Sequence, residues 1–136
     1  MIHGIEGFLN NEFIDLDEYL NNEENYELLK RTPSAFLGSC RYKLPTIEGN
    51  EEVYEKIFKI LETNEIDALF YIGGNDSMDT IKMLSDYAKE HNKKELFVGI
   101  PKTIDNDLPI TDHCPGYGSA AKYIATSLKE IIQPIH

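Results

Sequence analysis

The chain has 136 residues, of which 41% are apolar, and this is enough for one ordinary domain with a single core. Its net charge of −11 argues against a nucleic-acid partner, since that role needs a basic face. No apolar run approaches the roughly 20 residues of a membrane-spanning helix, and no signal peptide is visible at the N-terminus. Cys40 and Cys114 form no CxxC pair, as expected for two reduced thiols. These features predict a cytoplasmic protein without a membrane partner.

The first part of the chain predicts little regular structure. Residues 1–5 have the composition of a very short strand, and residues 13–20 ("FIDLDEYL") alternate apolar and acidic side chains, which predicts a half-exposed extended stretch. Residues 21–31 ("NNEENYELLKR") begin with Asn and Glu and end with Lys and Arg, the charge order that a short helix favours. Residues 32–50 contain several Pro and Gly residues and predict an ordered loop.

From residue 51 onward the pattern is regular. Apolar residues spaced by three and four predict helices at 51–64, 78–92 and 119–132. Two continuous apolar runs, 66–72 and 95–100, have the length of strands. In the last helix we expect an inward face, made of Ala121, Ile124, Ala125 and Leu128.

Helices that alternate with continuous apolar strands predict an α/β fold with a parallel sheet, covered on both faces. In such sheets ligands bind beyond the carboxyl ends of the strands. The polar segments 73–77 and 101–113 follow the two strands directly. We therefore expect both segments to face one ligand-binding crevice.

The first of these segments reads "GGNDS". One interpretation is a tight turn in which Gly73 and Gly74 take positive φ and Asn75, Asp76 or Ser77 caps the next helix. The other is a phosphate cradle, because a glycine pair exposes backbone N–H groups before a helix N-terminus. Asp76 would repel a phosphate there, unless the site excludes a longer phosphate chain or holds a metal.

The second segment reads "PKTIDNDLPITD". It suits a polar loop with Asn106 and Asp107 in turn positions, but it is also dense in reactive groups. Lys102 suits phosphate oxygens, Thr103 can donate to an oxygen, Asp105 can accept a proton and Asp107 can hold Mg²⁺. A cation, a metal and a carboxylate that takes the proton of an attacking hydroxyl are what phosphoryl transfer needs.

Three stretches resemble the 6-phosphofructokinases: "AFLGSCRYKLP", "LFYIGGNDSMDT" and "GIPKTIDNDLPITDHCPGYGSAAKYIA". The resemblance covers nearly the whole chain in register. It implies a Rossmann-like, three-layer N-terminal domain over residues 1–136, incomplete in this sequence. The first strand with its glycine-rich donor loop is expected before Met1, and the Met-Gly-Arg substrate segment and the C-terminal domain are expected after His136.

The resemblance also implies roles for single residues. Asp105 matches the base that takes the proton of the C1 hydroxyl of fructose 6-phosphate, and Thr103 matches a residue that contacts this sugar and the transferring phosphate. Asp107 matches a carboxylate beside Mg²⁺. Asn75 stands where most members carry a metal-binding aspartate; its amide offers an oxygen without the charge, which shifts the load onto Asp107 and the pyrophosphate. The implied phosphoryl-donor site comprises Arg41, Gly74, Asn75, Asp76, Ser77 and Lys102.

Two of these positions favour pyrophosphate as the donor. Members that use pyrophosphate carry Asp and Lys where this chain has Asp76 and Lys102, whereas members that use ATP often carry Gly. Asp76 would repel the α-phosphate of ATP and Lys102 would neutralise a pyrophosphate end, which is discrimination by repulsion. We expect Asp105, Lys102 and Asp76 to serve a pyrophosphate-dependent phosphofructokinase of glycolysis that forms fructose 1,6-bisphosphate.

Two alternatives stay open: an ATP-dependent 6-phosphofructokinase, and a truncated, non-catalytic remnant of either enzyme. In each case the resemblance implies a homo-oligomer in the full-length family.

Overall fold

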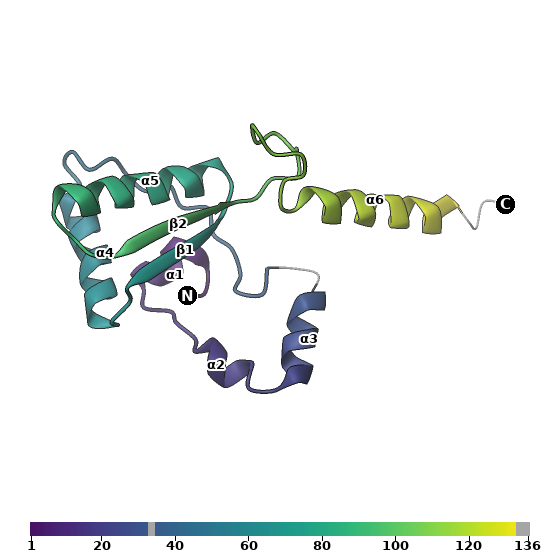
Figure 1. Ribbon diagram of the computed structural model, residues 1–136, viewed down its shortest axis with the longest axis horizontal. Helices are drawn as coiled ribbons and strands as arrows, with labels where there is room; N and C mark the ends of the chain where they lie inside the picture. Colours follow the sequence, from purple (N-terminus) through teal and green to yellow (C-terminus); the bar gives the residue numbers. More distant parts are fainter. Residues whose placement is uncertain (33–34, 133–136) are drawn as a thin grey trace. The chain divides into compact units, whose positions relative to one another are not determined.

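The computed structural model describes residues 1–32 and 35–132. The chain divides into two compact units, each described by itself. Met1–Asp67 and Tyr87–Glu95 make up the first unit, and the second comprises Ala68–Asp86 and the chain from Leu96 onward. Figure 1 traces the elements along the chain.

The first unit is helical. It contains α1 (Gly4–Leu9), α2 (Leu16–Tyr19), α3 (Glu23–Arg31), α4 (Glu51–Thr63) and the last turn of α5. Its core lies between α1 and α4, where the fully buried side chains are Ile5, Phe8, Tyr54, Ile57 and Leu61. The predicted helix at 51–64 is confirmed, because its apolar stripe is the face that this core buries.

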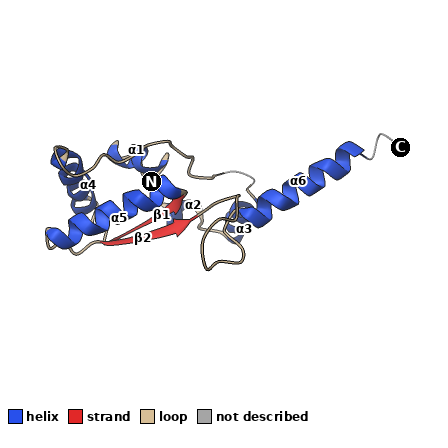
Figure 2. Ribbon diagram, turned by 90° about the horizontal axis from the view of Figure 1, so that it is seen from above, coloured by secondary structure: helices blue, strands red, loops and turns tan. Residues whose placement is uncertain are grey.

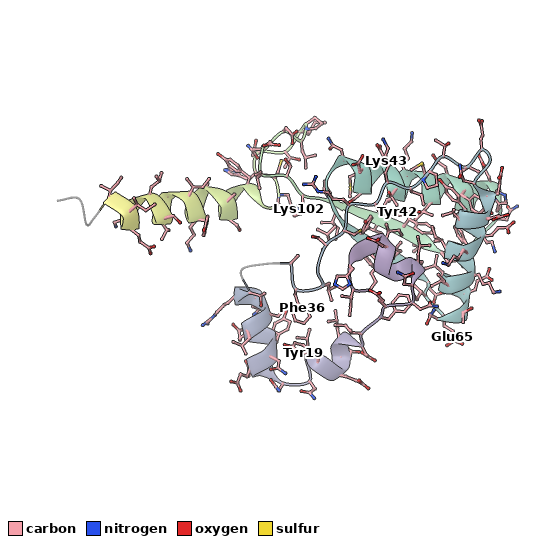
Figure 3. All side chains as sticks on the ribbon, turned by 180° about the vertical axis from the view of Figure 1, so that it is seen from behind. Tyr19, Phe36, Tyr42, Lys43, Glu65 and Lys102 are labelled. Atoms are coloured by element: carbon pink, nitrogen blue, oxygen red, sulfur yellow. The ribbon has the colours of Figure 1, made fainter. Side chains whose placement is uncertain are left out.

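Aromatic pairs add further contacts to this unit. The rings of Tyr54 and Tyr87 stack with centroids 5.1 Å apart. Tyr19 and Phe36, which face each other in Figure 3, also lie 5.1 Å apart. Residues 35–50 of the predicted loop contain no helix or strand, and residues 33–34 of that loop lie outside the described part of the chain.

The short elements near the N-terminus differ from our expectation. The helix predicted at 21–31 is confirmed as α3, with the Asn22 side chain accepting from the Asn25 N–H at 2.8 Å. The strand predicted at 1–5 is wrong, because Ile5 and Phe8 lie one helical turn apart and are both fully buried in α1. The extended stretch predicted at 13–20 is wrong at 16–19, since the Asp15 side chain accepts from the Asp17 N–H and starts α2.

The second unit contains a two-stranded parallel sheet. Strand β1 (Ala68–Gly73) pairs with β2 (Leu96–Pro101), with Tyr71 opposite Gly99. Helix α5 (Asn75–Glu90) runs alongside the strands (Figure 2). A Cβ atom added at Gly99 would lie 2.8 Å from the Sδ atom of Met78. Helix α5 therefore packs closely against one face of the sheet at Gly99, and the predicted α/β fold with a parallel sheet is confirmed.

The prediction that both faces of the sheet are covered is wrong. Phe70 and Ile72 of β1 and Leu96 of β2 are each at least 60% exposed. Leu69, Tyr71 and Gly73 alternate with the exposed residues of β1 and are buried. A continuous apolar run has the composition of a strand buried on both sides, but burial also requires a second layer. Within the described residues no element covers this second face.

Helix α6 (Tyr117–Ile132) is confirmed as an element, while its inward face is not. The predicted residues Ala121, Ile124, Ala125 and Leu128 are all exposed. In Figure 1, α6 leads away from β2. The amphipathic pattern predicted the helix correctly, but a pattern carries no information on whether a surface is present to pack against. Among the described residues, no helix has both the length and the apolar character needed to cross a bilayer.

Candidate active site at the carboxyl ends of the strands

The two polar segments begin side by side. Gly73, the last residue of β1, is paired with Pro101, the last residue of β2. The backbone N–H of Lys102 then donates to the carbonyl of Gly73 at 2.8 Å. Parallel strands bring their carboxyl ends to one edge, and this extra hydrogen bond continues the pairing into the loop. Both segments therefore begin at one edge of the sheet, as expected, while the ligand-binding crevice that they would share stays a prediction.

The segment after β1 passes into α5 without an intervening loop. The carbonyl of Gly74 accepts from the N–H groups of Ser77 at 3.0 Å and Met78 at 3.1 Å, so α5 begins at Asn75. The predicted capping by the Asn75, Asp76 or Ser77 side chain is wrong, because these residues already form the first helical turn. Gly74 occupies the capping position with its backbone alone.

The positive φ expected at Gly73 and Gly74 is also wrong. Positive φ among the described glycines occurs at Gly4, Gly38, Gly49 and Gly116. At Gly73 the reason for glycine is space, since an added Cβ would lie 2.7 Å from the Cβ of Ser77. At Gly74 an added Cβ would meet nothing within 4 Å. The missing side chain leaves the backbone there open to a ligand.

Asp76 stands in the exposed first turn of α5. The buried hydroxyl of Thr80, one turn further on, donates to the carbonyl of Asp76 at 2.8 Å. This turn therefore holds a carboxylate at the positive end of the helix dipole. An incoming anion would meet both the favourable helix N-terminus and this fixed negative charge.

The segment after β2 is held at its base by Thr103. The Thr103 N–H donates to the carbonyl of Pro115 at 3.0 Å, and Thr103 forms an isolated parallel bridge with Gly116. The Thr103 hydroxyl accepts from the N–H of Asp105 at 3.1 Å. This hydrogen bond closes a tight turn that places Asp105 directly beyond the sheet edge.

The charged side chains of this segment are open to solvent. Lys102 (labelled in Figure 3), Asp105 and Asp107 are exposed, while Thr103 is half-buried. A lysine and two carboxylates thus lie on a short loop whose backbone is anchored to the sheet. This arrangement can offer a cation to a phosphate and a carboxylate to a hydroxyl.

Asn106 has a larger part in this loop than the sequence suggested. Its backbone is left-handed, with φ 55°, as suits the predicted turn position. Its side chain also donates to the Asp112 carbonyl at 3.1 Å and accepts from the Cys114 N–H at 2.9 Å. The turn propensity of Asn was the only signal in the sequence, and it does not reveal these partners.

The residues expected to bind a metal supply few ligands of their own. The described residues contain no group of three His, Cys, Asp or Glu side chains that could hold a metal ion. Mg²⁺ is commonly held by one or two carboxylates together with substrate phosphates and water. The oxygen donors of Asn75 and Asp107 fit a Mg²⁺ that arrives with a phosphate ligand, and they do not form a protein-only cage.

The second unit brings together most of the predicted site residues at or next to the sheet edge. These are Gly74, Asn75, Asp76, Ser77, Lys102, Thr103, Asp105 and Asp107. Arg41 belongs to the first unit, where it is exposed in the loop before α4. Its part in a donor site stays a prediction.

The chain is similar in sequence to known phosphotransferases. The chain is 44% identical over 128 residues to a pyrophosphate–fructose 6-phosphate 1-phosphotransferase of Methylococcus capsulatus, covering 94% of this chain and 30% of that protein. An ATP-dependent 6-phosphofructokinase of Mannheimia succiniciproducens is 43% identical over 86 residues, covering 63% of this chain and 24% of that protein.

A solved structure shows the same fold. The crystal structure of a pyrophosphate-dependent phosphofructokinase from Nitrosospira multiformis matches with a TM-score of 0.81 and 40% identity, covering 95% of this chain and 31% of that one. The chain thus spans less than a third of the length of these relatives. The family model for phosphofructokinase matches residues 1–135, and the chain therefore belongs to the phosphofructokinase family.

Proposed function

We propose that this chain supplies part of the active site of an enzyme that transfers phosphate from pyrophosphate to the C1 hydroxyl of fructose 6-phosphate. The product is fructose 1,6-bisphosphate, and the reaction belongs to glycolysis in the cytoplasm. The observation that carries the proposal is the hydrogen bond from Lys102 to Gly73. It joins the segment with Asp76 to the segment with Lys102 and Asp105 at one sheet edge.

Each residue has a defined part in the proposed reaction. Asp105 accepts the proton of the C1 hydroxyl as that oxygen attacks the phosphate, which is general base catalysis. Thr103 contacts the sugar and the transferring phosphate. Lys102 offsets the charge of the pyrophosphate. Asn75 and Asp107 would hold Mg²⁺, which supplies charge neutralisation at the phosphate oxygens when it is bound.

Asp76 makes the choice of donor. Its carboxylate lies in the first turn of α5, beside the open backbone at Gly74, where the chain beyond the second phosphate of a nucleotide would have to pass. Pyrophosphate ends before this point and avoids the repulsion. Ser77 and the backbone at Gly74 would complete the donor contacts in the second unit, and Arg41 is the further donor residue that the resemblance implies. The proposed enzyme is a homo-oligomer, as the resemblance implies.

An ATP-dependent enzyme is the second candidate. It is favoured by the 43% identity to the Mannheimia succiniciproducens protein, although that match covers only 63% of the chain. Two relatives named for pyrophosphate each match over 94% of the chain at 43–44% identity, whereas an ATP-dependent relative that covers 86% of it is 36% identical.

We also propose that the isolated 136-residue chain is inactive, as a non-catalytic remnant would be. The charged site residues Asp76, Lys102, Asp105 and Asp107 are exposed, and the chain covers 30% of the length of the Methylococcus capsulatus relative. A purified chain that turns over fructose 6-phosphate with either donor would contradict this.

The donor is tested in a chimaeric enzyme. In it, residues 1–135 replace the matching segment of the Methylococcus capsulatus relative, and phosphorylation of fructose 6-phosphate is measured with pyrophosphate and with ATP. We expect a higher kcat/KM with pyrophosphate. A clear preference for ATP, or a folded chimaera without turnover, refutes the proposed function.

The role of Asp105 is tested by Asp105→Asn in the same chimaera. Loss of the base should lower kcat by roughly 10²–10⁴-fold, with a smaller effect on KM for pyrophosphate. Asp79→Asn, an equal charge change at an exposed position of α5, is the matched control and should change kcat little. Equal activity of the two variants would exclude Asp105 as the base.

A further inference from the structure

Asn106 stands between the two carboxylates that the proposed function uses, and its side chain bridges two parts of one loop. The Nδ2 group donates to the Asp112 carbonyl at 3.1 Å. The Oδ1 atom accepts from the N–H of Cys114 at 2.9 Å. One side-chain amide thus pairs with a backbone acceptor six residues further along the chain and with a backbone donor eight residues further along, both in the later part of the same loop.

The loop is therefore tied at two levels. At its base, Thr103 is bonded to Pro115 and paired with Gly116. Closer to its tip, Asn106 makes the two bonds to Asp112 and Cys114. Cys114 is buried, so the upper tie ends on a part of the loop that packing already holds in place.

The two neighbouring carboxylates have no such support from packing. Asp105 and Asp107 are exposed, so the direction of each carboxylate depends on the backbone that carries it. Asn106 joins that backbone to the far side of the loop through its two side-chain hydrogen bonds, while the Thr103 hydroxyl accepts from the Asp105 N–H.

We infer that Asn106 is a positioning residue, whose side chain holds Asp105 and Asp107 in the orientation that phosphoryl transfer needs. The inference rests on the proposed function, since it assigns Asn106 a part in that reaction. Misplacement of a reacting group by about 1 Å can cost on the order of 10²-fold in rate. The loss of this tie should thus appear in kcat.

A turn residue without a positioning role would behave differently. At φ 55°, Gly is at least as well suited as Asn. Asn106→Gly keeps the turn and removes both side-chain hydrogen bonds. Asn106→Ala removes the same bonds and adds backbone strain. Asn106→Gly therefore tests the two side-chain hydrogen bonds without disturbing the left-handed turn.

The test compares variants of the chimaeric enzyme. We expect Asn106→Gly to lower kcat by about tenfold or more, with KM for pyrophosphate within about threefold of the original, because the donor contacts at 74–77 are intact. Asn92→Gly is the matched control, since Asn92 is also left-handed, with φ 52°, in the turn after α5. It should leave kcat unchanged.

The outcomes separate the two claims. An active chimaera in which Asn106→Gly retains full kcat overturns the positioning role alone. So does a loss of kcat that is matched by the same loss in Asn92→Gly. A folded but inactive original chimaera refutes the proposed function, and the positioning role falls with it.

A second measurement tests the tie in the 136-residue chain. Asn106→Asp keeps the oxygen that accepts from Cys114 and loses the donor to Asp112. Amide hydrogen exchange at Cys114 should accelerate about tenfold in Asn106→Gly, in proportion to a lost hydrogen bond, and less in Asn106→Asp. Unchanged exchange in Asn106→Gly would show that the tie does not hold the loop, and would overturn the inference.

Discussion

Two opposite charges on neighbouring strand ends define the proposed donor site. Asp76 lies in the first turn of α5, and Lys102 is the residue that follows β2. A backbone hydrogen bond from Lys102 to Gly73 joins the ends of β1 and β2. Lys102 can attract any polyphosphate, whereas Asp76 can act only against a ligand that extends towards α5. Selection at this edge thus depends more on the repulsive charge than on the attractive one.

Asp76→Gly should remove this repulsion and allow the enzyme to use ATP. In the chimaeric enzyme we expect kcat/KM for ATP to rise by about tenfold or more, the equivalent of removing roughly 1.4 kcal/mol of repulsion at the donor. The value for pyrophosphate should change less. The measurement is the ratio of kcat/KM for the two donors.

Asp79→Gly is the control for Asp76→Gly, because it removes a carboxylate and introduces glycine into the same helix. Both changes replace Asp by Gly, at a similar small cost in helix propensity, so only a donor-specific effect distinguishes them. An unchanged donor ratio in Asp76→Gly would show that Asp76 does not select the donor, and would favour the ATP-dependent alternative.

At the scale of elements, the junction of β1 and α5 depends on two glycines with different reasons to be glycine. Gly73 has no room for a Cβ beside Ser77, whereas Gly74 faces open space. We expect Gly73→Ala to lower the free energy of unfolding by about 1–3 kcal/mol, the usual cost of overpacking, measured by urea denaturation of the chain. Gly74→Ala, the matched control, should cost less, because it loses only the preference for Gly over Ala at the capping position.

The variants Gly73→Ala and Gly74→Ala also distinguish an effect on stability from an effect on donor binding. If the backbone at Gly74 approaches the donor, Gly74→Ala should raise KM for pyrophosphate in the chimaera while it costs less stability than Gly73→Ala. Equal stability losses in Gly73→Ala and Gly74→Ala would show that contact with Ser77 is not what requires glycine at position 73.

In the helical first unit, we expect the ionisation of Tyr54 to make the stability of the protein depend on pH. This fully buried residue donates its hydroxyl to the carbonyl of Pro45 at 2.7 Å. Burial first, and then the electrostatic effect of Tyr42, raise the pKa of Tyr54 above its ordinary value near 10. The unfolded chain therefore loses this proton at lower pH than the folded one, and stability falls as pH rises above about 10.

Tyr54→Phe removes both the hydrogen bond and this titration. At pH 7 we expect a loss of about 1 kcal/mol. The gap between the two proteins should then narrow as pH rises above about 10, because only the original protein carries the titrating group. Urea denaturation at both pH values measures this. Tyr26→Phe, at a half-exposed position of α3, is the control, and a constant gap would contradict the pKa argument.

The spacing of apolar residues along the sequence correctly predicted the helices and strands that have a clear apolar pattern. The apolar stripes of α4 and α5 and the two apolar runs specified helix, strand, helix and strand in the correct order. The parallel pairing then placed the two polar segments at one edge. The sequence could not show why positions 73 and 74 are glycine. Either a positive φ or a lack of room for a side chain can require glycine, and the two requirements look the same in a sequence. The ties made by Asn106 join residues six and eight apart in a loop, where no period exists to reveal them.

At the scale of the whole molecule, composition could not show which apolar surfaces are covered. Phe70, Ile72, Leu96 and Val98 form the exposed apolar face of the sheet, since the residues paired across β1 and β2 project to the same side. The face is continuous over both strands. Contiguous exposed apolar surface of this kind promotes association.

We expect the 136-residue chain to self-associate through this face at micromolar concentration. Phe70→Lys combined with Leu96→Lys should reduce the association, because two charges replace two of its largest exposed side chains. Light scattering and binding of a hydrophobic dye measure it. Leu28→Lys combined with Ile110→Lys adds equal charge at other exposed apolar residues, on α3 and in the loop before α6. An equal reduction by this pair would mean that the effect of the added lysines is not specific to the sheet face, and that this face does not cause the association.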